Sequence, residues 1–197
     1  MTRLLPTILV VLSVLLAAER ARAAGNLEKQ TGVTFPDAIA QFAREEVREF
    51  PDRKLGVAIR YLAPGLAKAD IFIYDLGIKG IQTGAASRVV RAQFEQMLRD
   101  IFRLQERGAY AEVALLSKSE GPGLPQIGEL RLLHARFSYA ERSEAGTVGP
   151  KLISHAFLTG YRGTFLKIRV TYPVEVEAQA EKAIHQFFDD LRAILQL

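Results

Sequence analysis

The stretch Gly163-Thr-Phe-Leu-Lys-Ile-Arg-Val-Thr-Tyr172 decides the fold that this sequence predicts. Successive side chains of a strand point to opposite faces, and this stretch alternates with that period of two. Its β-branched and aromatic residues favour a strand, and Pro173 ends it because proline has no N–H for a sheet hydrogen bond. One face carries Leu166, Ile168, Val170 and Tyr172, and the other carries Phe165, Lys167, Arg169 and Thr171.

A second strand is predicted over residues 152–159, directly before the first, and the two should form an antiparallel hairpin. The turn between them is Gly160-Tyr-Arg-Gly163. If Gly160 lies opposite Gly163, then Ser154 lies opposite Arg169 and the apolar residues of both strands share one face. A slip by one residue would exchange the apolar face for the charged one, so we expect the register to be strongly fixed.

The rest of the chain shows the same alternation of strands with two helices. Residues 84–107 carry an apolar stripe at helical spacing that includes Val90, Phe94, Met97, Leu98 and Ile101. Such a regular stripe is typical of a helix packed on a core. Further strands are predicted over 55–62, 69–75, 110–116 and 129–139, and a second helix over 174–195. Because only Ala63-Pro-Gly65 and a few neighbouring residues separate the first two strands, they should pair antiparallel.

Residues 36–50 fit two structures. Pro36 and Asp37 suit the first turn of a helix, and the apolar spacing favours a helix over 36–42. The following stretch 43–50 is rich in charge, and it could continue the helix or form a charged edge strand.

The first residues have the pattern of an export leader. Arg3 precedes an apolar run over 4–18, and Ala21-Arg-Ala23 places small residues where a signal peptidase cleaves. We predict cleavage after Ala23, which gives a periplasmic or secreted mature protein. The alternative is a membrane anchor that is kept, but the run is shorter than the roughly 20 residues that a spanning helix needs.

The charge and the cysteine content exclude several classes of protein. The whole chain has a net charge of +4, and the leader accounts for half of it through three arginines and one glutamate. The remaining surplus is too small to indicate nucleic-acid binding. The chain has no cysteine, which excludes disulfides and a lipid-modified cysteine.

Runs of antiparallel strands with a helix after the second long strand and another at the end predict one α+β domain over 24–197. It should be a mostly antiparallel sheet of about six strands flanked by helices, an α/β/α sandwich.

Three stretches also resemble a known group of proteins. They are Leu55-Gly-Val with Ile-Arg-Tyr61 and Asp70-Ile-Phe-Ile-Tyr-Asp75, then Phe157-Leu-Thr-Gly160, and then residues 165–172 before a terminal helix. The chain resembles uncharacterised exported bacterial proteins whose element order is similar to the Mog1/PsbP-like sandwich. The resemblance implies an accessory or binding protein, and it favours a strand for 43–50.

The residues offer few candidates for chemistry. None of His134, His155 and His185 has metal-ligand spacing to another, and no cofactor motif is present, so we predict no metal and no cofactor. His155 falls among apolar positions, where it is either a satisfied core histidine or the centre of a catalytic site. Ser154, Lys167 and Arg169, with Arg60, are either paired with carboxylates or form a ligand pocket for an anion.

The sequence is compatible with two functions. The first is an exported, non-enzymatic module that binds an envelope protein or a small ligand, with speculative site residues Ser154, Lys167, Arg169, Arg60 and His155. The second is a periplasmic hydrolase-type enzyme with a site centred on His155, because catalytic groups need not be neighbours in sequence.

Overall fold

The computed structural model describes residues 25–120, 127 and 129–196. The predicted leader and its cleavage site after Ala23 lie outside the described residues. The strands are β1 (Asn26–Leu27), β2 (Thr34–Phe35), β3 (Ala38–Ile39), β4 (Phe42–Glu49), β5 (Val57–Ala63), β6 (Ala67–Tyr74), β7 (Tyr110–Glu120), β8 (Leu133–Arg142), β9 (Val148–Tyr161) and β10 (Thr164–Pro173). The helices are α2 (Arg88–Glu106) and α3 (Glu177–Leu195), with single 3₁₀ turns at Arg53–Leu55 and Val174–Val176.

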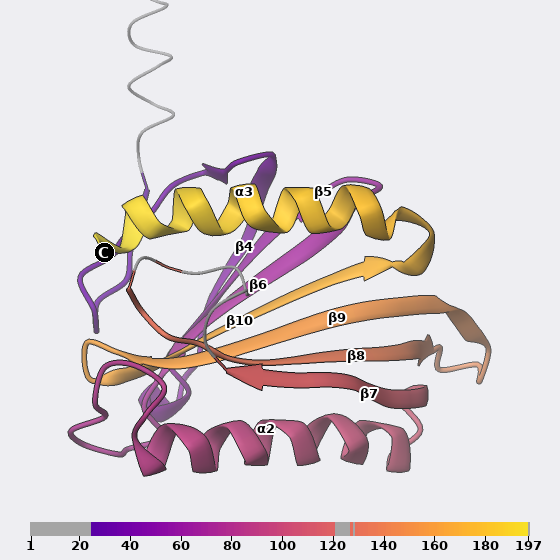
Figure 1. Ribbon diagram of the computed structural model, residues 1–197, viewed down its shortest axis with the longest axis horizontal. Coiled ribbons are helices and arrows are strands. Elements are labelled where there is room, and N and C mark those ends of the chain that lie inside the picture. The colour runs from indigo at the N-terminus through magenta and orange to yellow at the C-terminus, as the bar shows by residue number, and fades with distance from the viewer. Residues whose placement is uncertain (1–24, 121–126, 128, 197) are drawn as a thin grey trace, which may run out of the picture.

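Eight of these strands form one antiparallel sheet in the order β3-β4-β5-β6-β10-β9-β8-β7, and β1 pairs separately with β2. Helix α3 lies on one face of the large sheet and α2 on the other (Figure 1). The predicted α+β class with a mostly antiparallel sheet is therefore confirmed. The described sheet has more strands than the six expected, because β3 and β4 extend it beyond β5.

The alternating stretch Thr164–Pro173 is β10, and it lies in the middle of the sheet between β6 and β9. Its predicted apolar face packs under α3, where Ile168 and Phe157 share a core with Phe187 and Phe188 of the helix. Its other face carries Phe165 into the core beneath α2. Both faces of β10 are therefore covered along much of its length, which makes this strand the centre of the domain.

Helix α2 confirms the predicted stripe, because Val90, Phe94, Met97, Leu98 and Ile101 are all buried. The helix begins at Arg88 and not at 84, since the Ser87 hydroxyl caps it by accepting a hydrogen bond of 3.2 Å from the Val90 N–H. It ends at Glu106, and Gly108 follows with a φ of 73°, as a glycine after a helix commonly does.

The helix predicted over 36–42 is wrong, because β3 and β4 occupy that region and 42–49 is a strand. A bulge explains the misleading spacing. The register between β4 and β5 shifts between Arg44 and Glu46, so one extra residue enters β4. The extra residue lets Phe42 and Val47, five positions apart, pack on the same core. The strand alternative for 43–50 is the correct one.

The hairpin of β9 and β10 forms as predicted, but its register differs by two residues. Thr164 pairs with Tyr161, so the turn consists of Arg162 and Gly163 alone. Both turn residues have positive φ, 47° and 81°, as a two-residue type I′ hairpin turn requires. A shift of two keeps every side chain on its predicted face. Ser154 therefore pairs with Thr171 and not with Arg169.

Gly160 has another role than the predicted turn. Its N–H and C=O form two hydrogen bonds with Gly84, of 3.2 and 2.9 Å, which attach the segment before α2 to β9. A Cβ atom on Gly160 would lie 1.9 Å from the Gln82 carbonyl oxygen. The glycine is therefore required for the close approach of two backbones.

Candidate functional site

A cluster of charged side chains crosses three strands on the face covered by α2. The sheet register places Arg60 of β5, Asp70 of β6 and Arg169 of β10 side by side in one row. Arg60 Nε donates a 2.7 Å hydrogen bond to Asp70 Oδ1, and Asp70 is almost fully buried. Glu46 on β4 continues the row at 3.5 Å from the guanidinium of Arg60. We call Arg60, Asp70, Lys167 and Arg169 the cationic cluster.

Arg169 is held by hydroxyl groups. Its Nε donates to Ser154 Oγ at 3.0 Å, and its Nη2 donates to the hydroxyls of Tyr110 and Tyr139 at 3.0 and 2.7 Å. The two tyrosine rings stack on each other with centres 4.3 Å apart. Among the described residues, Arg169 has no carboxylate within ion-pair distance. Its nearest negative charge is that of Asp70, its cross-strand neighbour, which is already bonded to Arg60.

Lys167 lies next to Arg169 on the same face of β10, opposite Phe72. Its Nζ atom lies 3.9 Å from the centre of the Phe72 ring and 6.0 Å from that of Tyr74. The pKa of Lys167 is lowered to about 8, chiefly by burial and then by the neighbouring Arg169, while Asp70 partly opposes the shift. Among the described residues, these ring contacts are the close interactions found for the ammonium group, with no hydrogen bond or ion pair beside them. The ring contacts attract the cation without using its hydrogen-bond donors.

The structure divides the predicted site residues between the two faces of the sheet. Ser154, Lys167, Arg169 and Arg60 lie together beneath or beside α2, in or against the cationic cluster. His155 lies on the α3 face, where it pairs across the sheet with Val170. The five residues therefore do not form one site.

His155 belongs to a hydrogen-bonded chain of side chains that we call the histidine chain. Ser119 Oγ lies 3.3 Å from His134 Nδ1, and His134 Nε2 lies 3.1 Å from His155 Nδ1. His155 Nε2 then lies 3.0 Å from the Tyr172 hydroxyl and 3.2 Å from Glu181 Oε1. Tyr172 donates to the same carboxylate oxygen at 2.8 Å. The chain crosses from β7 through β8, β9 and β10 to α3.

The environment shifts the pKa values along this chain. Burial, with His155 as the next cause, lowers the pKa of His134 to about 4. The hydrogen bond from His155 lowers the pKa of Glu181 to about 2, so this carboxylate is ionised at neutral pH. His134 is accordingly neutral at pH 7.

Sequence reasoning did not find the partners of either cluster. His134 and His155 are 21 residues apart, and they meet because β8 and β9 are adjacent strands of the sheet. Asp70 was part of a predicted strand, yet its contact with Arg60 depends on the register of β5 and β6. The alternation did place Asp70 and Arg60 on strands predicted to pair, which is the one signal that could have joined them.

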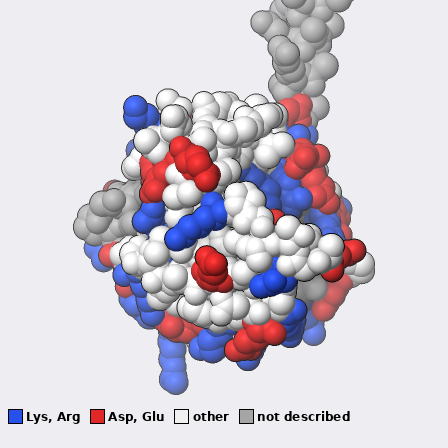
Figure 2. All heavy atoms as spheres, turned by 90° about the vertical axis from the view of Figure 1, so that its right-hand side faces the viewer, with Lys and Arg blue, Asp and Glu red and all other residues white. Residues whose placement is uncertain are grey.

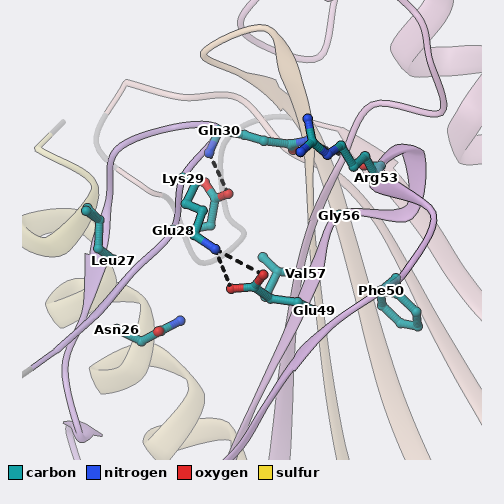
Figure 3. Close-up of a pocket in the computed structure, with 10 residues that line it drawn as sticks. All are labelled: Asn26, Leu27, Glu28, Lys29, Gln30, Glu49, Phe50, Arg53, Gly56 and Val57. Atoms are coloured by element: carbon teal, nitrogen blue, oxygen red, sulfur yellow. Dashed lines mark hydrogen bonds and ion pairs between the residues drawn. The ribbon is translucent and has the colours of Figure 1, made fainter.

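Two pockets lie elsewhere. A groove of about 380 Å³ separates the N-terminal segment around Glu28 and Lys29 from Glu49 and Arg53 (Figure 3). Lys29 Nζ bridges it, lying 3.2 Å from each carboxylate oxygen of Glu49. Two cations and two carboxylates line this groove, and the bridging pair is exposed, so its contribution is small. The groove therefore has no charge surplus that would select an ionic ligand.

The second pocket, of about 360 Å³, lies between α2 and β7. Ion pairs of Arg91 with Glu120 and of Lys118 with Glu95 join its two walls. Ser119 also lines this pocket, but its hydroxyl is turned to the opposite face of the sheet, where it meets His134.

The described residues contain neither a candidate metal site nor a candidate membrane-spanning helix. Among residues 25–120, 127 and 129–196, no group of three or more metal-binding side chains has a geometry that could hold an ion. Within the same residues, neither long helix has the length and apolarity needed to cross a bilayer.

Comparison with known proteins identifies no family for this chain. No family model matches the chain, and no curated protein matches it. Among solved structures it is similar to a protein of unknown function, PA94 from Pseudomonas aeruginosa, whose description suggests a regulator. The two share 14% identity over 84% of this chain and 88% of the other, with a TM-score of 0.36. A likeness this distant identifies neither a family nor a function.

Proposed function

We propose that the protein is an exported accessory module of the cell envelope that binds an anionic group of a partner protein or small ligand at the cationic cluster. The role of this cluster is binding and not turnover, and the fold is of the Mog1/PsbP-like kind. The leader pattern of residues 1–23 supports export. The resemblance described above supports the accessory role.

One observation carries the proposal, namely the surplus of positive charge in the cluster. Arg60, Lys167 and Arg169 share Asp70 as their one buried carboxylate, and Asp70 is bonded to Arg60. Lys167 is partly exposed and, among the described residues, has only aromatic rings as close partners. An anion bound beside Lys167 and Arg169 would supply the missing negative charge and accept hydrogen bonds from the ammonium group.

The position of the cluster also suits a binding site. Helix α2 packs mainly against β7, β8 and β9, and the cluster lies towards β5 and β6 on the same face. Arg60 and Lys167 are partly exposed there, so a ligand at the border of α2 could reach both.

The distribution of surface charge supports a protein or small-ligand partner over nucleic acid. Figure 2 shows basic and acidic side chains interspersed over the face in view, with no broad field of one sign. A nucleic-acid surface needs a basic stripe or patch along the phosphate backbone.

The alternative function, a periplasmic hydrolase-type enzyme centred on His155, is favoured by one specific observation. The histidine chain links an exposed hydroxyl to an ionised carboxylate through two imidazoles. It lies on the other face of the sheet, so the two functions can be tested separately.

The test of the binding proposal is capture of partners from an envelope extract by the mature protein, residues 24–197. In a second experiment, the purified protein is titrated with inorganic phosphate and with citrate, and calorimetry measures binding. Arg169→Glu should abolish both partner capture and anion binding, because it reverses the charge at the centre of the cluster. Arg99→Glu is the matched control, since Arg99 is exposed on α2 and hydrogen-bonds only to Gln96 among the described residues.

The circular dichroism spectrum and melting temperature must show that both variants are folded. Partner capture that is equal for the wild type and folded Arg169→Glu, together with no anion binding by the wild type, would overturn the proposal.

A further inference from the structure

The histidine chain has a defined direction. Tyr172 directs its hydroxyl hydrogen to Glu181, so neither atom that faces His155 Nε2 can donate to it, and this nitrogen must carry a hydrogen. In a neutral His155 the other nitrogen, Nδ1, is then an acceptor, and His134 Nε2 must donate to it. His134 Nδ1 is left with a lone pair that faces Ser119 Oγ. The network thus assigns the tautomers of both histidines.

The tautomers of the two histidines determine which hydrogen bond Ser119 forms. Its hydroxyl donates to a neutral imidazole nitrogen, which is the arrangement that activates a serine as a nucleophile. Ser119 is exposed on β7, the edge strand of the sheet. Its hydroxyl points to the α3 face, away from the ion pairs that its neighbours Lys118 and Glu120 form with α2. His134, His155 and Tyr172 are buried. The chain is therefore accessible at its two ends, through Ser119 on β7 and through the Glu181 side chain, which is 37% exposed.

We propose that Ser119 is an acyl-accepting nucleophile for carboxylic esters, with His134 as its general base and with His155 and Glu181 as positioning residues. This site lies apart from the cationic cluster, and the inference rests on the alternative hydrolase function and not on the proposed binding function.

Charge movement along the chain explains why two histidines are present. His134 is buried and faces the positive charge of Arg136, both of which disfavour its protonated form. When Nδ1 of His134 receives a proton, Nε2 can release its own proton to His155. The positive charge then rests on His155, which lies 3.2 Å from the ionised Glu181. The relay therefore places the charge beside its counter-ion.

The reaction balances with water as the second substrate. Ser119 Oγ attacks the ester carbonyl carbon as its proton passes to His134 Nδ1, and the proton on His134 Nε2 passes to His155. The tetrahedral intermediate then releases the alcohol, which takes a proton back through His134, and Ser119 remains acylated. Water attacks the acyl group by the same route, which releases the carboxylic acid and restores the hydroxyl.

The edge of the sheet can supply donors to the oxyanion. Strand β7 is the last strand of the large sheet, and β8 is its only strand partner among the described residues. The N–H groups that point outward from an edge strand lack a sheet acceptor, so they are available to an oxyanion formed at Ser119.

The test is labelling of the mature protein with a fluorophosphonate–biotin probe, followed by peptide mapping. Ser119 Oγ would attack the phosphorus atom and displace fluoride, which leaves a stable phosphonyl serine. The burst of p-nitrophenolate from p-nitrophenyl acetate gives a second measure of acylation. We expect label at Ser119, no label at this position in Ser119→Ala, and a rate about 100-fold lower in His134→Gln.

Ser117→Ala is the matched control, because Ser117 is an exposed serine of the same strand that pairs with Arg136. It should label like the wild type. Glu181→Gln should slow labelling and move the acid limb of the pH–rate profile to lower pH, because the imidazolium of His155 loses its counter-ion. This variant also serves if His134→Gln does not fold. A purely structural role for Glu181 would leave the pH profile unmoved.

The inference would be overturned by label that is no greater at Ser119 than at Ser117. It would also be overturned if both His134→Gln and Glu181→Gln were labelled at the rate of the wild type. The two proposals separate cleanly, because Arg169→Glu should not alter labelling and Ser119→Ala should not alter partner capture.

Discussion

Arg169 Nε donates a 3.0 Å hydrogen bond to Ser154 Oγ although the two residues are not opposite each other in the sheet. Ser154 pairs with Thr171, and Arg169 pairs with Ala156. The contact is a diagonal one, which the length of the arginine side chain permits. It ties β9 to the centre of β10 and turns the guanidinium towards Tyr110 and Tyr139.

The charge balance around this contact can be tested through Asp70. Asp70→Asn should lower the pKa of Lys167 below its value of about 8, because a negative charge that favours the ammonium form is removed. NMR titration of the Lys167 side chain measures the change. Asp100→Asn is the control, since Asp100 contributes less to the same pKa. A Lys167 pKa that stays constant in Asp70→Asn would contradict the assigned environment.

The stability of the protein should fall in acid because of His134. Its pKa is lowered to about 4 in the folded protein, so the unfolded chain takes up a proton first, at about 6.5. The stabilising contribution is present above pH 6.5 and is lost as the pH falls towards 4, by up to about 3 kcal/mol. Chemical denaturation from pH 7.5 to 4.5 measures the loss.

The charged and titratable groups that face His134 are His155, Glu181 and Arg136. Glu181 contributes to the pH dependence of stability only at lower pH, between its ordinary pKa near 4.5 and its lowered pKa of about 2. It therefore has little effect between pH 7.5 and 4.5. His134→Gln should therefore remove most of the slope above pH 4.5. An equal slope in this variant would assign the acid sensitivity to other groups.

Phe94 lies at the centre of the buried face of α2, so its truncation should lower the stability of the protein strongly. Phe94 is 2% exposed beneath the helix, so Phe94→Ala should destabilise the protein by about 3–5 kcal/mol. The control is Phe102→Ala on the same helix, where the ring is 37% exposed and the loss should be clearly smaller. Denaturant unfolding measures both, and equal losses would mean that the buried side of α2 is assigned wrongly.

Gly160 should not tolerate a side chain. Gly160→Ala places a Cβ atom 1.9 Å from the Gln82 carbonyl oxygen, so the two backbones must separate and the bonds to Gly84 weaken. We expect a loss of about 1–3 kcal/mol. In Gly149→Ala the nearest atom is 3.3 Å away, and this variant should lose much less. A melting temperature for Gly160→Ala equal to that of the wild type would exclude the proposed constraint.

Export can be checked on the protein itself. Mass spectrometry of the exported product should find Ala24 at the N-terminus, because Ala21 and Ala23 are the small residues of the predicted cleavage site. Ala23→Phe should block cleavage. A membrane-bound product that retains residues 1–23 in the wild type would favour the anchor alternative.

The sequence by itself determined the elements that a strong periodicity marks. The alternation of 164–172 and the stripe of α2 were predicted on the correct faces, because burial imposes those periods directly on the residues. Periodicity failed at β4, where the bulge near Glu45 changes the parity of the strand. It also did not determine the register of β9 and β10, which differs from the predicted one by two residues. A shift of two moves no side chain to the other face, so the alternation cannot detect it.

Only the tertiary structure decided which polar groups meet. His134 and His155 lie 21 residues apart in sequence, and Arg136 and Glu177 form an ion pair across 41 residues, through the order of the strands and the packing of α3. Local pattern carries no information on such pairs, because strand order is fixed by the burial of all the strands and helices together. The same packing separates His155 from Arg169 by the thickness of the sheet, so one set of predicted residues becomes two sites.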